Sequence, residues 1–182
     1  MRQYPQLELT PEQFEIEVKS ILDHLAGGLS NYNSEHREVI RGTDGEYEID
    51  VTLRFEAFGV TYLTLVECKR YKNPVPREKV QALHSKMQAV GAQKGIMFST
   101  SGFQSGAVEF ATAHGIALVH LQDGRTYYLR KAYDSGDGLI PWEKVPEYIP
   151  RVAGTLSVGE SMSLVSADHI DSLRSFLGLV PR

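Results

Sequence analysis

The first apolar pattern along the chain has the period of a helix. Thr10 precedes Pro11 and is followed three residues later by Gln13, which is the spacing of a capping box with proline at the first helical position. Apolar residues then recur every three or four positions, at Phe14, Val18, Ile21, Leu22 and Leu25. We therefore predict an amphipathic helix that begins at Pro11 and ends at the glycine pair 27–28.

The pattern then changes to that of strands. Residues 38–41, 48–58 and 60–70 are rich in β-branched and aromatic residues, and glycine-containing turns separate them. Within 61–69 successive side chains alternate between two faces that are both largely apolar until the strand ends. These features predict an antiparallel meander whose third strand is central and covered on both faces.

Helices and strands alternate in the next part of the chain. After a proline-containing loop we predict a helix, a strand, a helix and a strand, at 77–90, 94–99, 103–114 and 115–121. Such alternation favours parallel crossovers. A short strand at 126–129 is expected to form an edge hairpin with the strand before it. We therefore expect an α/β fold whose mixed sheet starts as a meander, continues with parallel α/β crossovers and is flanked by helices.

Beyond Ala132 the composition shifts to glycine, aspartate and proline. We therefore predict a main domain of residues 1–132 and a C-terminal extension of residues 133–182, with a weak helical pattern at 167–177. The extension could serve as a dimerisation arm or as a cap on the domain.

Composition excludes several classes of protein. The chain has 182 residues and a single cysteine, which rules out an internal disulfide framework and a cysteine-based zinc site. No run of about 18 apolar residues occurs, and the N-terminus lacks the apolar region of a signal peptide. We therefore expect a cytoplasmic protein that does not associate with a membrane.

Charge is distributed unevenly. The formal net charge is −4, from 19 basic and 23 acidic residues. Residues 69–94 nevertheless carry seven basic residues and one acidic residue, so the rest of the chain is strongly acidic. This segment could face a polyanion, or its lysines could simply be solvated on one face of a helix.

Three charged residues are expected to meet where two strands pair. Glu67 and Lys69 lie on one face of a strand, about 7 Å apart along the backbone. If the strands pair through the turn at 58–59, Asp50 falls opposite a residue near Glu67, because 58.5 is the midpoint of 50 and 67. The alternative is a cross-strand ion pair of a common structural type.

Two converging carboxylates beside a lysine suit phosphodiester hydrolysis. Asp50 and Glu67 would supply oxygen ligands to Mg²⁺, for which Mn²⁺ is expected to substitute, and the backbone carbonyl of Cys68 could supply another. Lys69 would hold or deprotonate the attacking water and stabilise the charge that develops on the phosphate.

These residues resemble a known family. Asp50 followed by Glu67-Cys68-Lys69 resembles the signature of the PD-(D/E)xK nuclease superfamily, and its surroundings resemble the Mrr-like type IV restriction endonucleases. The resemblance extends from about residue 14 to residue 121. It rests on Phe14-Glu15, on Gly42, Asp44, Gly45, Ile49, Asp50 and Val51, and on the segments 66–71, 95–103 and 107–111.

The resemblance implies a restriction-endonuclease-like fold in residues 1–132 and Mg²⁺-dependent hydrolysis of DNA in restriction or defence. By matching, Asp50 and Glu67 would bind the metal, Lys69 would serve catalysis, and Glu15 of the first helix would complete the metal site. A homodimer, or a separate protein that supplies recognition, would let the enzyme cut both strands or find its target.

The chain departs from the family pattern in two places. Two extra residues between Gly45 and Ile49 make Glu48 a competitor of Asp50 as metal ligand. Related nucleases place Gln-x-x-x-Tyr on the next helix, where this chain has Gln81 and Ser85.

The DNA contacts are expected around the basic segment and at the turn before the helix predicted at 103–114. In that turn Ser101 and Gln104 have capping-box spacing, and the helix N-terminus could hold a phosphate. The candidate DNA-binding residues are Arg70, Lys72, Arg77, Lys79, Gln81 and Ser101.

Other functions remain open from the sequence. The charged cluster could be structural in a catalytically inactive nuclease fold, which would then act as a nucleic-acid-binding or assembly subunit. The substrate could also be RNA, single-stranded DNA or a branched junction.

Overall fold

The structure is a computed structural model that describes residues 9–26, 28–123 and 148–153. The described elements are α1 (Pro11–Leu25), β1 (Ser30–Arg41), β2 (Glu46–Ala57), β3 (Val60–Lys69), α2 (Arg77–Val90), β4 (Lys94–Ser99), α3 (Ser105–Ala113), β5 (Ala117–Asp123) and β6 (Tyr148–Ala153). The strand predicted at 126–129, the helix predicted at 167–177 and most of the extension 133–182 lie outside these residues.

The six described strands form one sheet in the order β1-β2-β3-β4-β5-β6. β1, β2 and β3 pair antiparallel, and β3, β4 and β5 pair parallel. The predicted α/β fold with a mixed sheet is therefore confirmed. β6 pairs antiparallel with β5 and was not predicted. It contains Pro150, which weakens a strand signal and is tolerated because β6 lies at the edge of the sheet.

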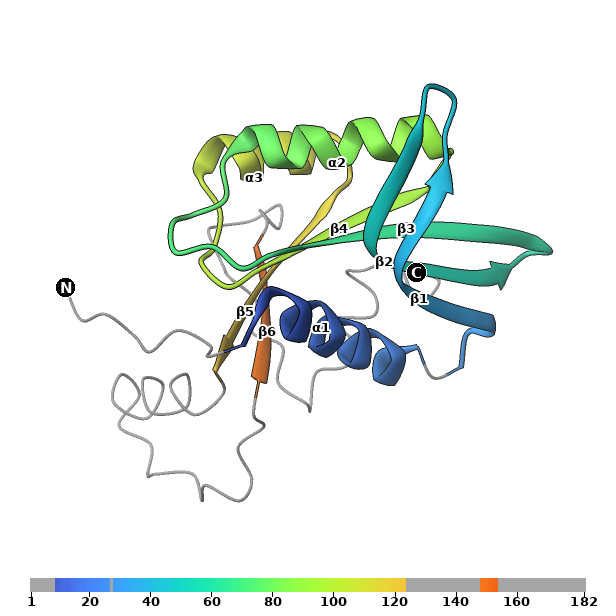
Figure 1. The fold of residues 1–182 in the computed structure, drawn as a ribbon, viewed down its shortest axis with the longest axis horizontal. Helices are drawn as coiled ribbons and strands as arrows, with labels where there is room; N and C mark the ends of the chain where they lie inside the picture. Colours follow the sequence, from blue (N-terminus) through green and yellow to red (C-terminus); the bar gives the residue numbers. More distant parts are fainter. Residues whose placement is uncertain (1–8, 27, 124–147, 154–182) are drawn as a thin grey trace, which may run out of the picture.

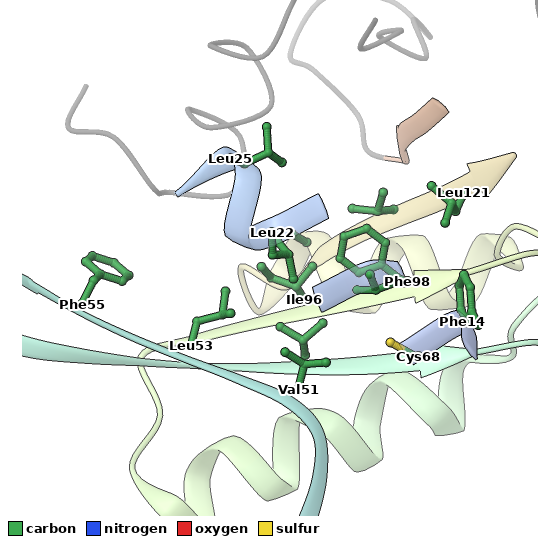
Figure 2. Packing of buried hydrophobic residues seen from close by; sticks show 14 residues of the cluster. Phe14, Leu22, Leu25, Val51, Leu53, Phe55, Cys68, Ile96, Phe98 and Leu121 are labelled. Atoms are coloured by element: carbon green, nitrogen blue, oxygen red, sulfur yellow. The ribbon is translucent and has the colours of Figure 1, made fainter. Parts of the chain in front are cut away.

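Helices cover both faces of the sheet (Figure 1). α1 packs on one face, where Phe14 and Leu22 meet Val51 of β2 and Phe98 of β4 in a fully buried cluster (Figure 2). α2 and α3 lie on the other face, in a second cluster that includes Leu83 and the strand residues beneath it. No helix in the described ranges is both long enough and apolar enough to cross a membrane.

Helix boundaries follow the predicted signals closely in two helices. The Thr10 hydroxyl accepts a hydrogen bond from the Gln13 amide, and the Gln13 side chain accepts one from the Thr10 amide, which completes the predicted capping box. α2 has the predicted bounds and ends at Gly91, whose φ of 71° is the left-handed conformation that glycine adopts easily.

The prediction was wrong at the start of α3. Gln104 is the N-cap and makes no side-chain cap, so Ser101 and Gln104 do not form a capping box. The Ser101 hydroxyl instead donates to the carbonyl of Asn73, and the Ser101 amide donates to the Ser99 hydroxyl. The bond to Asn73 ties the turn after β4 to the loop after β3.

β1 starts earlier than predicted, because the polar residues of its first part do not resemble a strand. It begins at Ser30 rather than near residue 38. Before Val39 its residues are polar apart from Tyr32, so its alternation of exposed and half-buried positions leaves little strand signal in the sequence. The tip of the β1–β2 hairpin reaches the end of α2, where the Thr43 amide donates to the Ala89 carbonyl at 2.9 Å (Figure 1).

Close packing of α2 on β4 depends on Gly95. A Cβ at this position would lie 2.4 Å from the sulfur of Met87, which neighbours Lys86 on α2. The absence of a side chain at Gly95 thus lets α2 approach the strand beside β3.

We expect Gly95→Val to lower the free energy of unfolding by about 1–3 kcal/mol, because the added methyl groups overpack this contact. Gly45→Ala is the matched control, since a Cβ there meets nothing within 4 Å. It should change stability by less than about 0.5 kcal/mol in the same denaturant titration. An equal loss in both variants would contradict the role of Gly95.

Candidate active site

The site forms where β2 and β3 separate. The two strands pair up to Val51↔Val66, and Asp50 is the next residue of β2. Ile49 and Val51 would share a face in a regular strand but belong to the two different core clusters, so β2 turns at Asp50. The Cys68 amide of β3 donates to Oδ2 of Asp50 at 2.7 Å. A side-chain carboxylate thus provides the acceptor for a β3 amide at the point where the two strands cease to pair.

Lys69 lies between two carboxylates. Its Nζ is 2.5 Å from Oε2 of Glu67 and 3.6 Å from Oδ2 of Asp50. The three side chains are largely buried, with exposed fractions of 7% for Glu67, 18% for Lys69 and 22% for Asp50. The structure therefore brings together the three residues that the sequence singled out.

A second lysine reaches Glu67 from α2. Nζ of Lys86 lies 2.6 Å from Oε1 of Glu67 and donates to the backbone carbonyl of Glu48 at 3.0 Å. Each oxygen of Glu67 thus has an ammonium partner, and the four charged groups together are formally neutral.

The surroundings move the pKa values of the two carboxyl groups in opposite directions. Burial and then the negative charge of Glu67 raise the pKa of Asp50. Burial also acts to raise the pKa of Glu67, but Lys69 and Lys86 outweigh it and the pKa is lowered. The pKa of Lys69 is raised because the two carboxylates outweigh its burial, so its ammonium is fully ionised at neutral pH.

Glu15 reaches inward from α1, with 11% of its side chain exposed. Its Oε2 accepts hydrogen bonds from Arg37 Nε at 2.9 Å and lies 2.8 Å from Nε2 of His36. It is near enough to Asp50 to add to the rise of the Asp50 pKa. Arg37 has a φ of 53°, an uncommon conformation for a residue other than glycine, asparagine or aspartate. Glu15 is thus oriented by two residues of β1, and its role as a metal ligand stays a prediction.

Glu48 and Cys68 are placed differently from the three central residues. The side chain of Glu48 is exposed, so the geometry favours Asp50 over Glu48 as the partner of Glu67. The Cys68 thiol belongs to the cluster under α1, on the opposite face from Glu67, and burial raises its pKa well above the usual value. It is therefore a neutral thiol rather than a nucleophile. The use of its backbone carbonyl as a metal ligand stays a prediction.

The candidate DNA-binding residues fall into two groups. Arg70, Lys72 and Gln81 are exposed, and Lys79 is half-buried on α2. Arg77 is also exposed, but it lies over the ring of Phe110, with Cζ 5.2 Å from the ring centre. Ser101 is engaged with Asn73, so its hydroxyl has a structural partner. The structure does not bring Gln81 into contact with the carboxylates.

Sequence reasoning missed Lys86, His36 and Arg37 as residues of the site. A signal for Lys86 exists, because it stands three residues after Leu83 and four before Val90, on the apolar stripe of its helix. A lysine there needs an acidic partner. His36 and Arg37 carried no signal, because they fall in the polar part of β1 that was not predicted as strand.

The donor set fits a magnesium ion that uses few protein ligands. No group of three or more histidine, cysteine, aspartate or glutamate side chains in the described ranges is arranged to hold a metal. Mg²⁺ is, however, commonly held by one or two carboxylates together with substrate phosphates and water. Asp50 and Glu67 provide two such carboxylates in a partly water-excluded position.

Comparison with known families identifies the family of the chain. The family model Mrr_cat, described as restriction endonuclease, matches residues 7–125 and so covers the site. The chain belongs to this restriction endonuclease family. The resemblance to Mrr-like enzymes seen in the sequence is thereby confirmed.

Individual relatives are distant or partial. The type IV methyl-directed restriction enzyme EcoKMrr of Escherichia coli strain K12 is 31% identical over 116 residues, which are 62% of this chain and 36% of that enzyme. The chain thus spans little more than a third of this relative.

Two solved structures are similar in part. The protein of unknown function AF1548 has a TM-score of 0.46 and 21% identity over 59% of this chain and 55% of its own. The DNA modification-dependent restriction endonuclease AspBHI has a TM-score of 0.41 and 19% identity over 58% and 27%.

We expect Asp50→Asn to raise the free energy of unfolding of the metal-free protein by about 1 kcal/mol at pH 7.5, as is common when a strained active-site charge is removed. The pKa of Asp50 is higher in the folded than in the unfolded chain, so the ionised wild-type residue opposes folding above that pKa. The gain should therefore shrink as the pH falls through the folded-state pKa, where Asp50 becomes neutral.

Urea unfolding in EDTA at several pH values measures this effect. Glu67→Gln is the matched control and should destabilise the protein, because it removes an anion that two ammonium groups hold. Destabilisation by Asp50→Asn at pH 7.5 would contradict the electrostatic picture.

Proposed function

We propose that the protein is a Mg²⁺-dependent endonuclease that hydrolyses DNA phosphodiester bonds at Asp50, Glu67 and Lys69. The observation that carries the proposal is the largely buried contact of Lys69 with both carboxylates. Membership of the restriction endonuclease family supports it. Restriction of foreign or modified DNA is the role we infer, because EcoKMrr is a methyl-directed restriction enzyme.

Each residue has a distinct task in this proposal. Asp50 and Glu67 would hold Mg²⁺ or Mn²⁺, with the Cys68 carbonyl and Glu15 as further candidate ligands. The bound ion would neutralise the phosphate and acidify a water molecule. Lys69, which is ionised in the metal-free protein, would stabilise the charge that develops on the phosphate and orient the water. Cys68, through its amide, fixes the carboxylate of Asp50.

DNA would dock through side chains that the fold leaves available. Arg70, Lys72 and Lys79 make no hydrogen bond or ion pair through their side chains with the described part of the chain. We propose that they contact backbone phosphates.

Cleavage of both strands would need two such sites, so we propose that the enzyme acts as a homodimer or with a separate recognition subunit. Residues 133–182 are our candidate for the dimer contact.

One observation favours a second function. Both oxygens of Glu67 are paired with ammonium groups, as they would be in a structural ion cluster. In that case the protein would bind nucleic acid or assemble with a partner without cutting. Mn²⁺ titration separates the two functions. A metal site should bind Mn²⁺ in the wild type and not in Asp50→Asn, whereas a structural ion cluster should bind no Mn²⁺ in either protein.

We expect Glu67→Gln, Asp50→Asn and Lys69→Met each to reduce plasmid cleavage in Mg²⁺ by at least about 100-fold, because the first two remove a metal-binding carboxylate and the third removes the positive charge beside the reacting phosphate. EDTA should stop cleavage, and Mn²⁺ should restore it. Purified protein, supercoiled plasmid and gel analysis provide the measurement.

Glu48→Gln is the control for these variants, because the Glu48 side chain is exposed. It should keep near-wild-type cleavage. Intact plasmid with the wild-type protein, or loss of cleavage in Glu48→Gln alone, would count against the proposed site.

We expect Lys72→Gln and Lys79→Gln to weaken binding to a DNA duplex at all sequences and each to reduce the salt-dependence slope by about 1. Lys94→Gln is the control, because the Lys94 ammonium donates to the Gly115 carbonyl at 2.5 Å. Fluorescence anisotropy in EDTA across a range of salt concentrations measures the slopes. Unchanged slopes in the first two variants would place the DNA elsewhere.

A further inference from the structure

Lys86 connects α2 to both strands of the candidate site. Its ammonium contacts Oε1 of Glu67 on β3 and the backbone carbonyl of Glu48 on β2. Its side chain is only 26% exposed. The opposite oxygen of Glu67 is taken by Lys69. Lys86 therefore fills the half of the Glu67 carboxylate that Lys69 leaves open.

The position of Lys86 is costly for a lysine. It stands on the apolar stripe of α2, next to Met87, which packs against β4 at Gly95. Burying an ammonium in such a place is unfavourable unless it is paired, and holding a long side chain in one geometry also costs conformational entropy. A lysine on the solvent-exposed face of α2 would not have these costs of desolvation and lost conformational entropy. This placement suggests that the contact with Glu67 has a function.

A divalent cation at Asp50 and Glu67 competes with the ammonium groups for the same oxygens. Lys69 shares both carboxylates and follows Glu67 on the same strand by two residues, so it stays beside the site. Lys86 touches only one of the carboxylates, and a flexible four-carbon stem joins it to a different element. Of the two lysines, Lys86 is therefore the one that can leave.

Resting on the proposed function, we propose that Lys86 is an internal competitor of the metal, whose ammonium holds Glu67 in place in the metal-free protein and withdraws from it when a divalent cation binds. The carboxylate pair is thus preorganised without a metal, because Lys86 and Lys69 together offset the repulsion between Asp50 and Glu67. The same contact weakens metal binding, since the cation must displace a positive charge. Lys86 is a positioning residue rather than a catalytic residue.

Mn²⁺ affinity tests this directly, without activity as the readout. Isothermal titration of the full chain with Mn²⁺ should show at least about tenfold tighter binding to Lys86→Met than to the wild type, which corresponds to about 1.4 kcal/mol. Lys79→Met removes the same charge from the same helix without touching Glu67 and should shift the affinity less than about threefold, as expected for a screened charge. Lys86→Arg keeps the charge and should bind Mn²⁺ nearly as the wild type does.

Lys86→Gln provides a second test if Lys86→Met folds poorly, and circular dichroism monitors folding in each variant. Mn²⁺ binding to both Lys86 variants that is no tighter than to Lys79→Met would overturn the role of Lys86, while metal binding by the wild type would leave the proposed function standing. Failure of the wild type to bind Mn²⁺ at millimolar concentration would instead overturn the proposed function and this inference with it.

Discussion

The candidate site depends on one interaction, the sharing of the Lys69 ammonium by the carboxylates of Asp50 and Glu67. Two like charges are unfavourable in a position that is largely removed from water, and the rise of the Asp50 pKa reflects that cost. Lys69 and Lys86 offset it from two different elements. The two carboxylates can therefore lie side by side in the folded protein, where both would be available to a divalent cation in the proposed function.

The fold creates this pair by ending the contact between two strands. β2 turns away from β3 at Asp50, and the carboxylate of Asp50 then accepts the hydrogen bond of the Cys68 amide. The helices on the two faces add further charged groups. α1 brings Glu15 from one side, and α2 brings Lys86 from the other (Figure 1). The site is therefore held by the sheet and by both helical layers, so its geometry depends on packing such as that at Gly95.

Sequence patterns predicted the elements that have strong local signals. The capping box at Thr10, the left-handed glycine at Gly91 and the midpoint of the turn at 58–59 gave the ends of α1 and α2 and the register of β2 and β3. The register in turn placed Asp50 near Glu67. These signals are local, or follow from the period of a strand, so one sequence is enough to read them.

Other features depend on tertiary contacts and could not be read in this way. The first half of β1 is polar, and β6 contains a proline, so neither resembles a strand until its neighbour is known. The Ser101 hydroxyl donates a hydrogen bond to the carbonyl of Asn73 instead of capping α3. The partners of Glu15, His36 and Arg37, lie in the polar half of β1, so no strand pattern predicted their position. Among the site residues that were missed, only Lys86 has a sequence signal, because it is a lysine on the apolar stripe of α2.

Anomalous scattering of Mn²⁺ in crystals of the protein shows most directly whether Asp50 and Glu67 bind a metal together. We expect one peak within about 2 to 2.5 Å of oxygens from both Asp50 and Glu67, as hard cations require. A peak on Glu48 instead of Asp50, or no peak beside Glu67, would contradict the account.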